Sequence, residues 1–444
     1  MVGCDATPIM LLLAFDSVST FYSTRPGGID CLLTDHLEIC FTDTVNNGLD
    51  GTLPQELGYL TTLKAITIVA NKIEGSFPPS FHRLTNLQVF AFHKNFLTGN
   101  IPSWLGGTGG DRSSLSPTNS GGASPGGGSS GANTGGMDQL TFIDVSGNML
   151  TGILPPFDGA GLKNNLEVLA VDDNSLEGNI DVVWDFPNLK HVNLEKNSFS
   201  GELPNAIVVT NPKLVTLDVS ENRLGGSLPG DLFQLTDLEI LDLHGNDLTG
   251  TLPSSDDVNK LWSLSRTLNF KFVALHDNSL SGSIPATLGP NLGAGGTLRH
   301  LDLSRNQFVG EIPAELKDLA LSKDLSYLSL GDNNYTPGPI PTFLYTFSRL
   351  RELSLKSCAR TGPVSPLIAF STNLILLDLS GNAITGPIPT ELGKISNLQF
   401  LLLHQNSFTG QVPSNALGKL SALRTFSILS ANSWLCVCPV SLLF

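Results

Sequence analysis

The sequence predicts a solenoid of stacked coils in which each coil places one strand in a long parallel β-sheet. Three observations carry this prediction: a segment recurs along most of the chain, leucines alternate within each copy, and asparagine, glycine and proline follow at fixed offsets. A single coil cannot bury its own apolar side. A stack of coils makes one continuous core that is stabilised by contacts between neighbouring coils.

The copies align on an asparagine that follows the alternating leucines, as in LEILDLHGNDLTGTLP at residues 238–253. Several successive anchors are 24 residues apart, as from 222 to 246, and the longer steps contain insertions. We therefore expect fourteen coils, anchored at Asn47, Asn71, Asn95, Asn148, Asn174, Asn197, Asn222, Asn246, Asn278, Asn306, Asn333, Cys358, Asn382 and Asn406.

Each residue type that recurs at a fixed position of the repeat has a physical role. The leucines alternate with a period of two, which turns them toward the inside of the coil along a strand. The asparagine amide has two donors and two acceptor sites, and we expect it to satisfy buried backbone groups of its own and adjacent coils. A thiol is a poor donor, so Cys358 fits this position weakly. The glycine four residues after the asparagine permits a conformation closed to other residues, and the following Ile-Pro or Leu-Pro pair ends any helix.

Composition excludes several classes of function. The chain has 444 residues, with 25 Lys plus Arg against 40 Asp plus Glu, a formal charge of −15. Nucleic acids and anionic bilayers need a basic face, so neither is an expected partner. The longest apolar run, residues 9–15, is too short to span a membrane.

No catalytic motif lies in a credible structural context. Matches to G-x-S-x-G and G-x-G-x-x-G occur only in the glycine-rich segment at residues 122–131, without the flanking strand and helix that their mechanisms require. The sequence therefore predicts no enzymatic activity and no cofactor.

The repeats divide the chain into five parts. We expect an N-terminal cap region at 1–46, three repeats at 47–106, an unstructured insertion at 107–136, repeats 4–14 with a degenerate last coil at 137–430, and a cap remnant at 431–444. The insertion contains 11 Gly and 7 Ser among its 30 residues, so little apolar material is available to order it.

The termini and cysteines bear on the cellular compartment. The apolar stretch at 9–15 fits either a weak signal segment, without a positive charge before it, or an amphipathic capping helix. Cys31 and Cys40 are candidates for a disulfide, and the close spacing of Cys436 and Cys438 disfavours a direct bond. Asn334 begins the only N-x-S/T sequence and is the glycosylation candidate.

The repeated Asn-x-Leu-x-Gly-x-Ile-Pro pattern resembles the plant-type leucine-rich repeat of receptor-like kinase and receptor-like protein ectodomains and of polygalacturonase-inhibiting proteins. The resemblance implies a right-handed, curved solenoid with the parallel sheet on its concave face and an extra short strand near the Leu-x-Gly step. The ends depart from the family pattern, since no tryptophan lies near Cys31 and Cys40. No kinase follows in the sequence, so the resemblance implies no kinase activity.

Three functions are consistent with these features. The leading prediction is a non-enzymatic recognition protein, extracellular or at the cell surface, that binds a peptide, protein or glycan on the concave face. The alternatives are an inhibitor of an extracellular cell-wall-degrading hydrolase and the ligand-binding fragment of a receptor-like kinase. The sequence gives no prediction of oligomeric state.

The variable strand positions form the default recognition surface of such an array. We number the strand segment L-x-x-L-x-L-x-x-N from 1 to 9. Positions 3, 5, 7 and 8 are expected to face solvent on the concave side, where aspartates, histidines and aromatic residues recur. The candidate ligand-binding residues are Asp218, Asp242, His244, Phe272, His276, Asp302, Tyr327, Phe400 and Leu402.

Two groups within this set carry specific expectations. Phe400 and Leu402 lie beside Leu376 of the previous coil and form either an apolar binding patch or a surface covered by residues after 423. His244 and His276 occupy position 7 of successive coils, so we expect them to be close neighbours and to titrate near pH 6–7. The alternative is that both histidines are ordinary solvated residues. A metal site needs three or four convergent ligands, and only His244, His276 and Asp242 are plausible here, so the sequence predicts no metal site.

Overall fold

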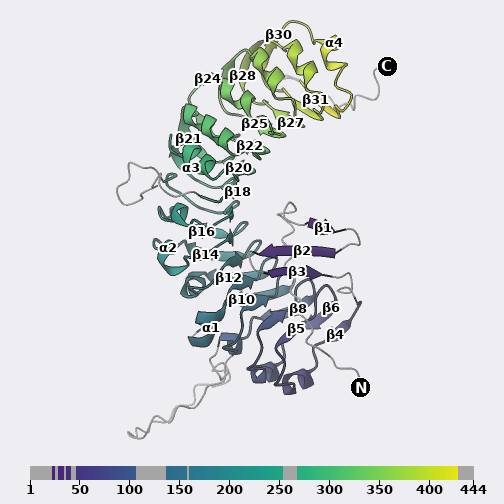
Figure 1. Ribbon diagram of the computed structural model, residues 1–444, viewed down its shortest axis with the longest axis vertical. Helices are drawn as coiled ribbons and strands as arrows, with labels where there is room; N and C mark the ends of the chain where they lie inside the picture. Colours follow the sequence, from purple (N-terminus) through teal and green to yellow (C-terminus); the bar gives the residue numbers. More distant parts are fainter. Residues whose placement is uncertain are drawn as a thin grey trace. The chain divides into compact units, whose positions relative to one another are not determined.

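The computed structural model describes residues 47–106, 137–157, 160–253 and 268–428, together with the backbone of three strands between residues 23 and 41. The chain divides into two compact units, Met1–Ser200 and Gly201–Phe444, which are described separately. Figure 1 shows the succession of coils within each of them.

The first unit contains a parallel ladder of strands in the order of the sequence. Leu169 pairs with Ile143 on one side and Val192 on the other, so equivalent repeat positions lie in register. Each strand covers positions 3–5 of the predicted repeat, which confirms the alignment of these coils. The strands are β5 (Ala65–Thr67), β7 (Val89–Ala91), β9 (Phe142–Asp144), β11 (Val168–Ala170) and β13 (His191–Asn193).

The second unit repeats this arrangement. Leu241 pairs with Leu217 and with Val273, again at equivalent positions. The buried leucines at positions 4 and 6 form its core, as the alternation predicts. The strands are β15 (Thr216–Asp218), β17 (Ile240–Asp242), β18 (Phe272–Ala274), β20 (His300–Asp302), β22 (Tyr327–Ser329), β25 (Glu352–Ser354), β27 (Leu376–Asp378), β29 (Phe400–Leu402) and β31 (Thr425–Ser427).

Short strands after the asparagine form the additional ladders that the family resemblance implies. In the first unit they are β4 (Asp50–Thr52), β6 (Lys72–Gly75), β8 (Phe96–Asn100), β10 (Met149–Ile153), β12 (Ser175–Asn179) and β14 (Ser198–Glu202). In the second they are β16 (Arg223–Gly225), β19 (Ser281–Ser283), β21 (Gln307–Gly310), β23 (Asn334–Tyr335), β24 (Gly338–Pro339), β26 (Arg360–Gly362), β28 (Ala383–Pro387) and β30 (Ser407–Thr409).

Helical turns complete the coils, in most of them after the proline that ends the repeat motif. The α-helices are α1 (Ala160–Asn165), α2 (Ile207–Thr210), α3 (Leu288–Ala294) and α4 (Ser414–Leu417). The 3₁₀ helices are η2 (Gln55–Tyr59), η3 (Pro79–Arg83), η4 (Ser103–Gly106), η6 (Asp181–Asp185), η7 (Leu232–Gln234), η8 (Ala314–Leu321), η9 (Thr342–Thr346), η10 (Pro366–Phe370) and η11 (Thr390–Lys394). Within the described ranges, no helix has the length and apolar character of a membrane span.

The asparagine and glycine positions behave as the sequence predicts. Asn246 donates through Nδ2 to the carbonyls of Val219, Leu243 and His244, while its Oδ1 accepts the backbone N–H of Leu224. One side chain thus connects two coils by satisfying buried backbone groups of both. Gly250, four residues later, has a φ of 81°, which a residue with a side chain adopts only with strain.

One coil of the second unit departs from the regular repeat. The segment from Asn333 to Ile340 is one residue longer than its counterpart from 306 to 312. The additional ladder divides there, because β23 pairs with β21 of the preceding coil whereas β24 pairs with β26 of the following coil. Arg360 occupies the usual leucine position of that following coil and is only 3% exposed. Its guanidinium donates to the carbonyls of Thr336 and Pro339 and so connects the following coil to the irregular one.

The insertion does not interrupt the ladder of long strands. Val89 of β7 pairs with Phe142 of β9, and Phe92 donates its backbone N–H to the carbonyl of Asp144 at 2.8 Å. The coils on the two sides of the insertion are therefore direct neighbours. Residues 107–136 themselves lie outside the described part of the chain.

We expect that deleting residues 107–135 will leave the midpoint of thermal unfolding within a few degrees of the parent protein. The paired strands β7 and β9 are retained, and the entropy of closing a long loop changes slowly with loop length. Differential scanning calorimetry of both proteins tests this. Loss of the cooperative transition in the deletion variant would show that the insertion packs against the coils.

Three antiparallel strands lie near the N-terminus of the first unit: β1 (Ser23–Arg25), β2 (Ile29–Thr34) and β3 (Leu37–Phe41). The backbone register of β2 and β3 places Cys31 opposite Cys40. Their side chains are outside the described part of the structure, as are Cys436 and Cys438. The Cys31–Cys40 disulfide therefore stays a prediction.

Candidate functional site

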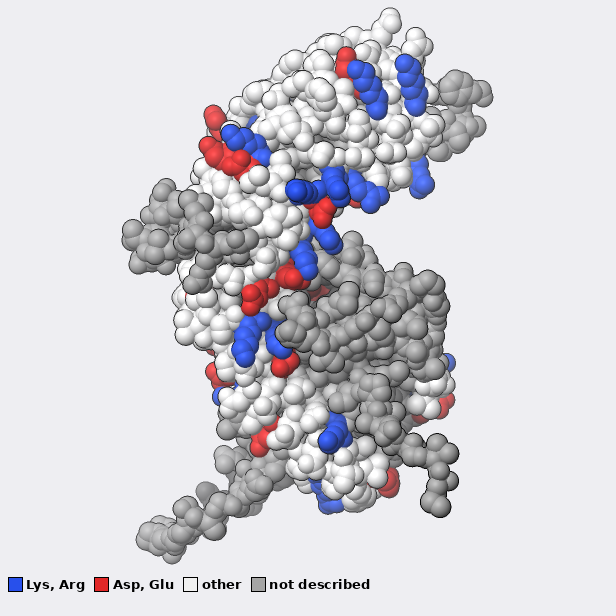
Figure 2. Space-filling model, in the orientation of Figure 1, with Lys and Arg blue, Asp and Glu red and all other residues white. Residues whose placement is uncertain are grey.

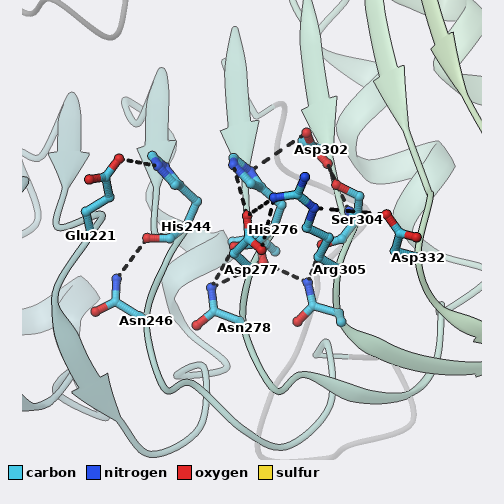
Figure 3. Close-up of polar contacts among 12 residues, drawn as sticks. Glu221, His244, Asn246, His276, Asp277, Asn278, Asp302, Ser304, Arg305 and Asp332 are labelled. Atoms are coloured by element: carbon cyan, nitrogen blue, oxygen red, sulfur yellow. Dashed lines mark hydrogen bonds and ion pairs between the residues drawn. The ribbon is translucent and has the colours of Figure 1, made fainter. Parts of the chain in front are cut away.

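The second unit brings together most of the predicted ligand-binding residues on one face of its long-strand sheet. Positions 3, 5 and 7 of β17, β18, β20 and β22 supply the side chains, because successive strands lie in register. Figure 3 shows His244, His276 and Asp302 on successive coils, with Glu221 on the coil before them. We call this group and its immediate neighbours the imidazole site; its members are Glu221, Asp242, His244, Phe272, His276, Asp277, His300, Asp302 and Tyr327.

The two histidines at position 7 are close neighbours, as predicted. The rings of His244 and His276 stack with their centroids 4.4 Å apart and their planes 6° from parallel. His244 lies between two carboxylates: its Nδ1 is 2.6 Å from Oδ1 of Asp242 and its Nε2 is 3.5 Å from Oε1 of Glu221. His276 lies 3.8 Å from Oδ2 of Asp302 through its Nδ1. The pair is therefore asymmetric in its electrostatic surroundings.

This asymmetry corrects the expectation that both histidines titrate near pH 6–7. Burial opposes a charge on His244, but the hydrogen bond and charge of Asp242, with help from Asp218 and Glu221, raise its pKa to about 9. Burial lowers the pKa of His276, and the attraction of Asp302 offsets this only in part. At neutral pH the pair therefore holds one charged and one neutral ring.

The aspartates at position 5 are not exposed, which corrects a second expectation. Asp218, Asp242 and Asp302 are at most 5% exposed. Oδ1 of Asp218 accepts hydrogen bonds from the backbone N–H and hydroxyl of Ser220, and Asp302 holds Ser304 in the same way. An aspartate that bonds the backbone two residues ahead stabilises the turn at the end of its strand. These carboxylates fix the turns that border the face and contribute to its electrostatic potential.

Three aromatic rings at position 3 form a continuous stack beside the histidine pair. His300 lies between Phe272, at a centroid distance of 4.2 Å, and Tyr327, at 4.0 Å, with nearly parallel planes. The Tyr327 hydroxyl donates to Oδ2 of Asp302 at 2.9 Å. Burial lowers the pKa of His300 to about 4, so this ring is neutral. The three rings of the stack are half-buried.

Several members of the imidazole site were missing from the sequence prediction. His300 was not among the candidates, although Phe272 and Tyr327 at the same position of the adjoining coils indicated a row of rings. Glu221 and Asp277 lie at position 8, which was expected to belong to the recognition surface, but neither residue was among the candidates. Position 8 adopts a left-handed conformation in these coils, with a φ of 49° at Glu221 and 52° at Asp277.

Charged side chains continue from the imidazole site toward the later coils. Arg305 contacts Asp277 at 3.0 Å, and Lys356 contacts Asp332 at 3.0 Å. Figure 2 shows the same mixture elsewhere on the visible face, where acidic and basic side chains adjoin in small groups on a mainly uncharged surface. No group of histidine, cysteine and carboxylate residues in the described ranges has an arrangement that could hold a metal ion.

The remaining predicted site residues lie apart from the imidazole site. Phe400 and Leu402 are on β29, separated from β22 by β25 and β27, and both are half-buried. Phe400 pairs with Leu376 on one side, as expected, and with Thr425 of β31 on the other. Of the residues after 423 that could cover this patch, Thr425–Ser427 form β31 beside β29, and those beyond 428 lie outside the described residues. Asn334 is exposed on β23, and its glycosylation stays a prediction.

The raised pKa of His244 predicts a defined dependence of stability on pH. A group whose pKa is higher in the folded state stabilises the fold below its unfolded pKa of about 6.5 and loses this effect as the pH rises through the folded value. We expect the midpoint of thermal unfolding of the parent protein to exceed that of His244→Gln by several degrees at pH 6.5. The difference should shrink steadily toward pH 9.5.

Thermal unfolding at intervals between these pH values measures this effect. This pH range lies above the lowered pKa of His276, so protonation of His276 does not contribute to the difference. His404→Gln is the matched control, because His404 occupies the same repeat position but contacts the Ser427 hydroxyl. A difference between parent and His244→Gln that does not change with pH would contradict the assignment of a charged His244.

Comparisons with known proteins agree with this fold. A family model described as "Leucine rich repeat" matches residues 187–248, and a second model of that description matches residues 139–159, 297–319 and 373–395. Receptor-like protein 35 of Arabidopsis thaliana is 27% identical over 255 residues, which cover 51% of this chain and 25% of that protein. The chain spans between a fifth and a quarter of the length of the first curated relatives that it matches.

Solved structures give the same result over more of the chain. The ectodomain of the plant membrane receptor kinase GASSHO1/SCHENGEN3 from Arabidopsis thaliana, in complex with CASPARIAN STRIP INTEGRITY FACTOR 2, has a TM-score of 0.65 and 30% identity. The match covers 86% of this chain and 43% of that one. The Arabidopsis receptor kinase HAESA, in complex with the peptide hormone IDA and the co-receptor SERK1, has a TM-score of 0.62 and 25% identity over 84% of this chain and 59% of that one. The chain is thus a plant-type leucine-rich repeat protein.

Proposed function

We propose that this chain is a non-enzymatic, extracellular recognition protein that binds a peptide at the imidazole site. The observation that carries the proposal is the in-register row of half-buried rings on the concave side of β17 to β22. Rings held by stacking lose little conformational freedom on binding, so they offer apolar contact area at low entropic cost.

The electrostatics of the site favour a ligand with basic side chains. Carboxylates outnumber cations around the rings, and those of Glu221 and Asp277 are not fully buried. Glu352 lies beside Tyr327 in the strand register and extends the acidic character at that end of the aromatic stack. The ligand that fits is a peptide with an arginine or lysine flanked by an apolar or aromatic residue, since both kinds of group find partners here.

The similarity to receptor ectodomains supports a peptide in preference to a glycan. The HAESA structure contains a peptide hormone, and this chain resembles that receptor over most of its own length. The extracellular assignment rests on the same relatives, of which several are receptor-like proteins and one is a plant membrane receptor kinase.

Selection from a displayed library of random twelve-residue peptides tests the proposed function. The full chain is immobilised, and enriched peptides are synthesised and measured by isothermal titration calorimetry. We expect enriched peptides to be basic and to bind Phe272→Ser at least about tenfold more weakly than the parent, because the variant opens the ring stack at its edge.

A matched substitution distinguishes this site from other surfaces. Phe400→Ser changes an aromatic residue at the same repeat position of a distant coil and should leave the affinity unchanged. Enriched peptides that bind the parent and Phe272→Ser equally would place recognition elsewhere. Absence of any enrichment would contradict peptide recognition itself.

A further inference from the structure

The long strands of the first unit are apolar on both faces. On the inner side of the coil, Phe90 and Phe92 pack against Phe77 with ring centroids 5.1 and 5.2 Å away. Successive side chains of a strand point to opposite faces, so Val89 and Ala91 lie on the other face of β7. That other face is the one which the second unit uses for its imidazole site.

This concave face of the first unit carries a separate apolar cluster. Its members come from positions 3, 5 and 7 of successive coils, and each is at most 8% exposed. We call the cluster the inner apolar patch; it consists of Val69, Val89, Ala91, Phe142, Val168 and Ala170. A sheet with apolar residues on both faces is stable in water only when both faces are covered.

Repeat geometry alone does not explain the burial of the patch. Phe142 is 1% exposed, whereas Phe272, at position 3 of the second unit, remains partly exposed. The side chains of His93 at position 7 and Asp144 at position 5 are also buried more fully than repeat geometry explains. His93 Nδ1 lies 2.9 Å from Oδ2 of Asp144, and both side chains are 0% exposed. An ionisable pair shielded so fully from water requires atoms above the sheet.

We propose that the concave face of the first unit is an intramolecular docking surface, and that the β1–β3 sheet of residues 23–41 covers it. A three-stranded sheet is stable only if it has a hydrophobic face, and packing against an apolar surface removes that face from water. The sequence of β2 and β3 supplies complementary apolar residues, because the strand register gives one face to Leu32, Leu37, Ile39 and Phe41. Both elements belong to the same compact unit.

The glycine-rich insertion lacks this complementarity. Residues 107–136 contain 11 glycines and 7 serines and only one leucine, so they cannot supply the apolar area that the patch requires. Residues 42–49 connect β3 to β4 of the first coil, and a connection of this length can reach about 26 Å when extended, at about 3.3 Å per residue, which allows β1–β3 to lie over the coils.

Hydrogen exchange of the full chain, followed by mass spectrometry, tests the docking surface. We compare the parent with Phe142→Asp, which places a carboxylate in the middle of the inner apolar patch. The expected result is that amides of residues 29–41 exchange at least about tenfold faster in the variant, because docking is lost. Amides of β17 to β22 should exchange as in the parent.

Three controls make the outcome decisive. Phe400→Asp carries the same kind of substitution at position 3 of the second unit and should leave exchange at residues 29–41 unchanged. Val89→Thr, which is nearly isosteric, provides a milder change within the patch if Phe142→Asp disrupts the coils themselves. Deletion of 107–135 should leave protection of the patch strands intact.

Two results would overturn the proposal. Unchanged exchange at residues 29–41 in both Phe142→Asp and Val89→Thr would show that this segment does not dock on the patch. A dimer in light scattering of the parent, converted to a monomer by Phe142→Asp, would assign the patch to a second copy of the chain. Neither result bears on peptide binding at the imidazole site, so the two proposals are tested independently.

Discussion

Replacement of Arg360 by alanine is expected to lower the free energy of unfolding by about 2–4 kcal/mol. The guanidinium donates to the carbonyls of Thr336, Pro339 and Cys358 at 2.6, 3.3 and 2.7 Å, respectively. Alanine removes these donors at the point where the additional ladder divides, and it leaves a cavity in the core position that leucine fills in other coils. Urea denaturation followed by circular dichroism measures the change.

A second variant separates the loss of hydrogen bonds from the loss of volume. Arg360→Leu fills the core position with the usual residue of the repeat but provides no donors, so we expect it to be less stable than the parent and more stable than Arg360→Ala. A leucine variant as stable as the parent would mean that the three hydrogen bonds contribute nothing beyond the cost of burying the charge.

Cys358 in the same coil is the companion test of the repeat alignment. Its Sγ lies 3.2 Å from the carbonyl of Leu330, and its backbone N–H donates to Oδ1 of Asn382. The thiol contact is the one that an asparagine amide makes to the preceding coil, as Asn246 does to Val219, so Cys358→Asn should be neutral or stabilising. Marked destabilisation would contradict the equivalence of Cys358 with the asparagines.

Replacement of Asn246 by alanine is expected to lower the free energy of unfolding by about 1–3 kcal/mol, because a buried group left without its partner pays the full cost of desolvation. The variant leaves the Leu224 N–H without its acceptor and removes the donor to the carbonyl of Val219 on the preceding coil. The effect should therefore extend beyond the coil that carries the substitution. Urea denaturation provides the free energy.

The neighbouring residue is the matched control for this variant. Asp247 is exposed and immediately follows Asn246, so Asp247→Ala should change the free energy of unfolding by less than about 0.5 kcal/mol. Equal effects of the two substitutions would show that the asparagine amide does not hold adjacent coils together.

Local periodicity was enough to predict the strands and their register. The alternation around Leu241 and the asparagine at 246 specify which residues turn inward, because both features act within one coil and recur in each neighbour. The proximity of His244 and His276 also followed from register alone, since equal repeat positions on adjacent parallel strands lie side by side.

The sequence by itself therefore determined the repeat, the long strands, the asparagine ladder and the placement of two histidines on one face. Only the tertiary structure decided that Asp242 is buried and raises the pKa of His244. It also decided that His300 completes a stack of rings and that Arg360 replaces a leucine in the core. The physical reason is the range of the interactions. The periodicity of the sequence specifies the residues that each coil requires to form. The burial, the charge state and the stacking of a side chain depend on other coils, more than 20 residues away.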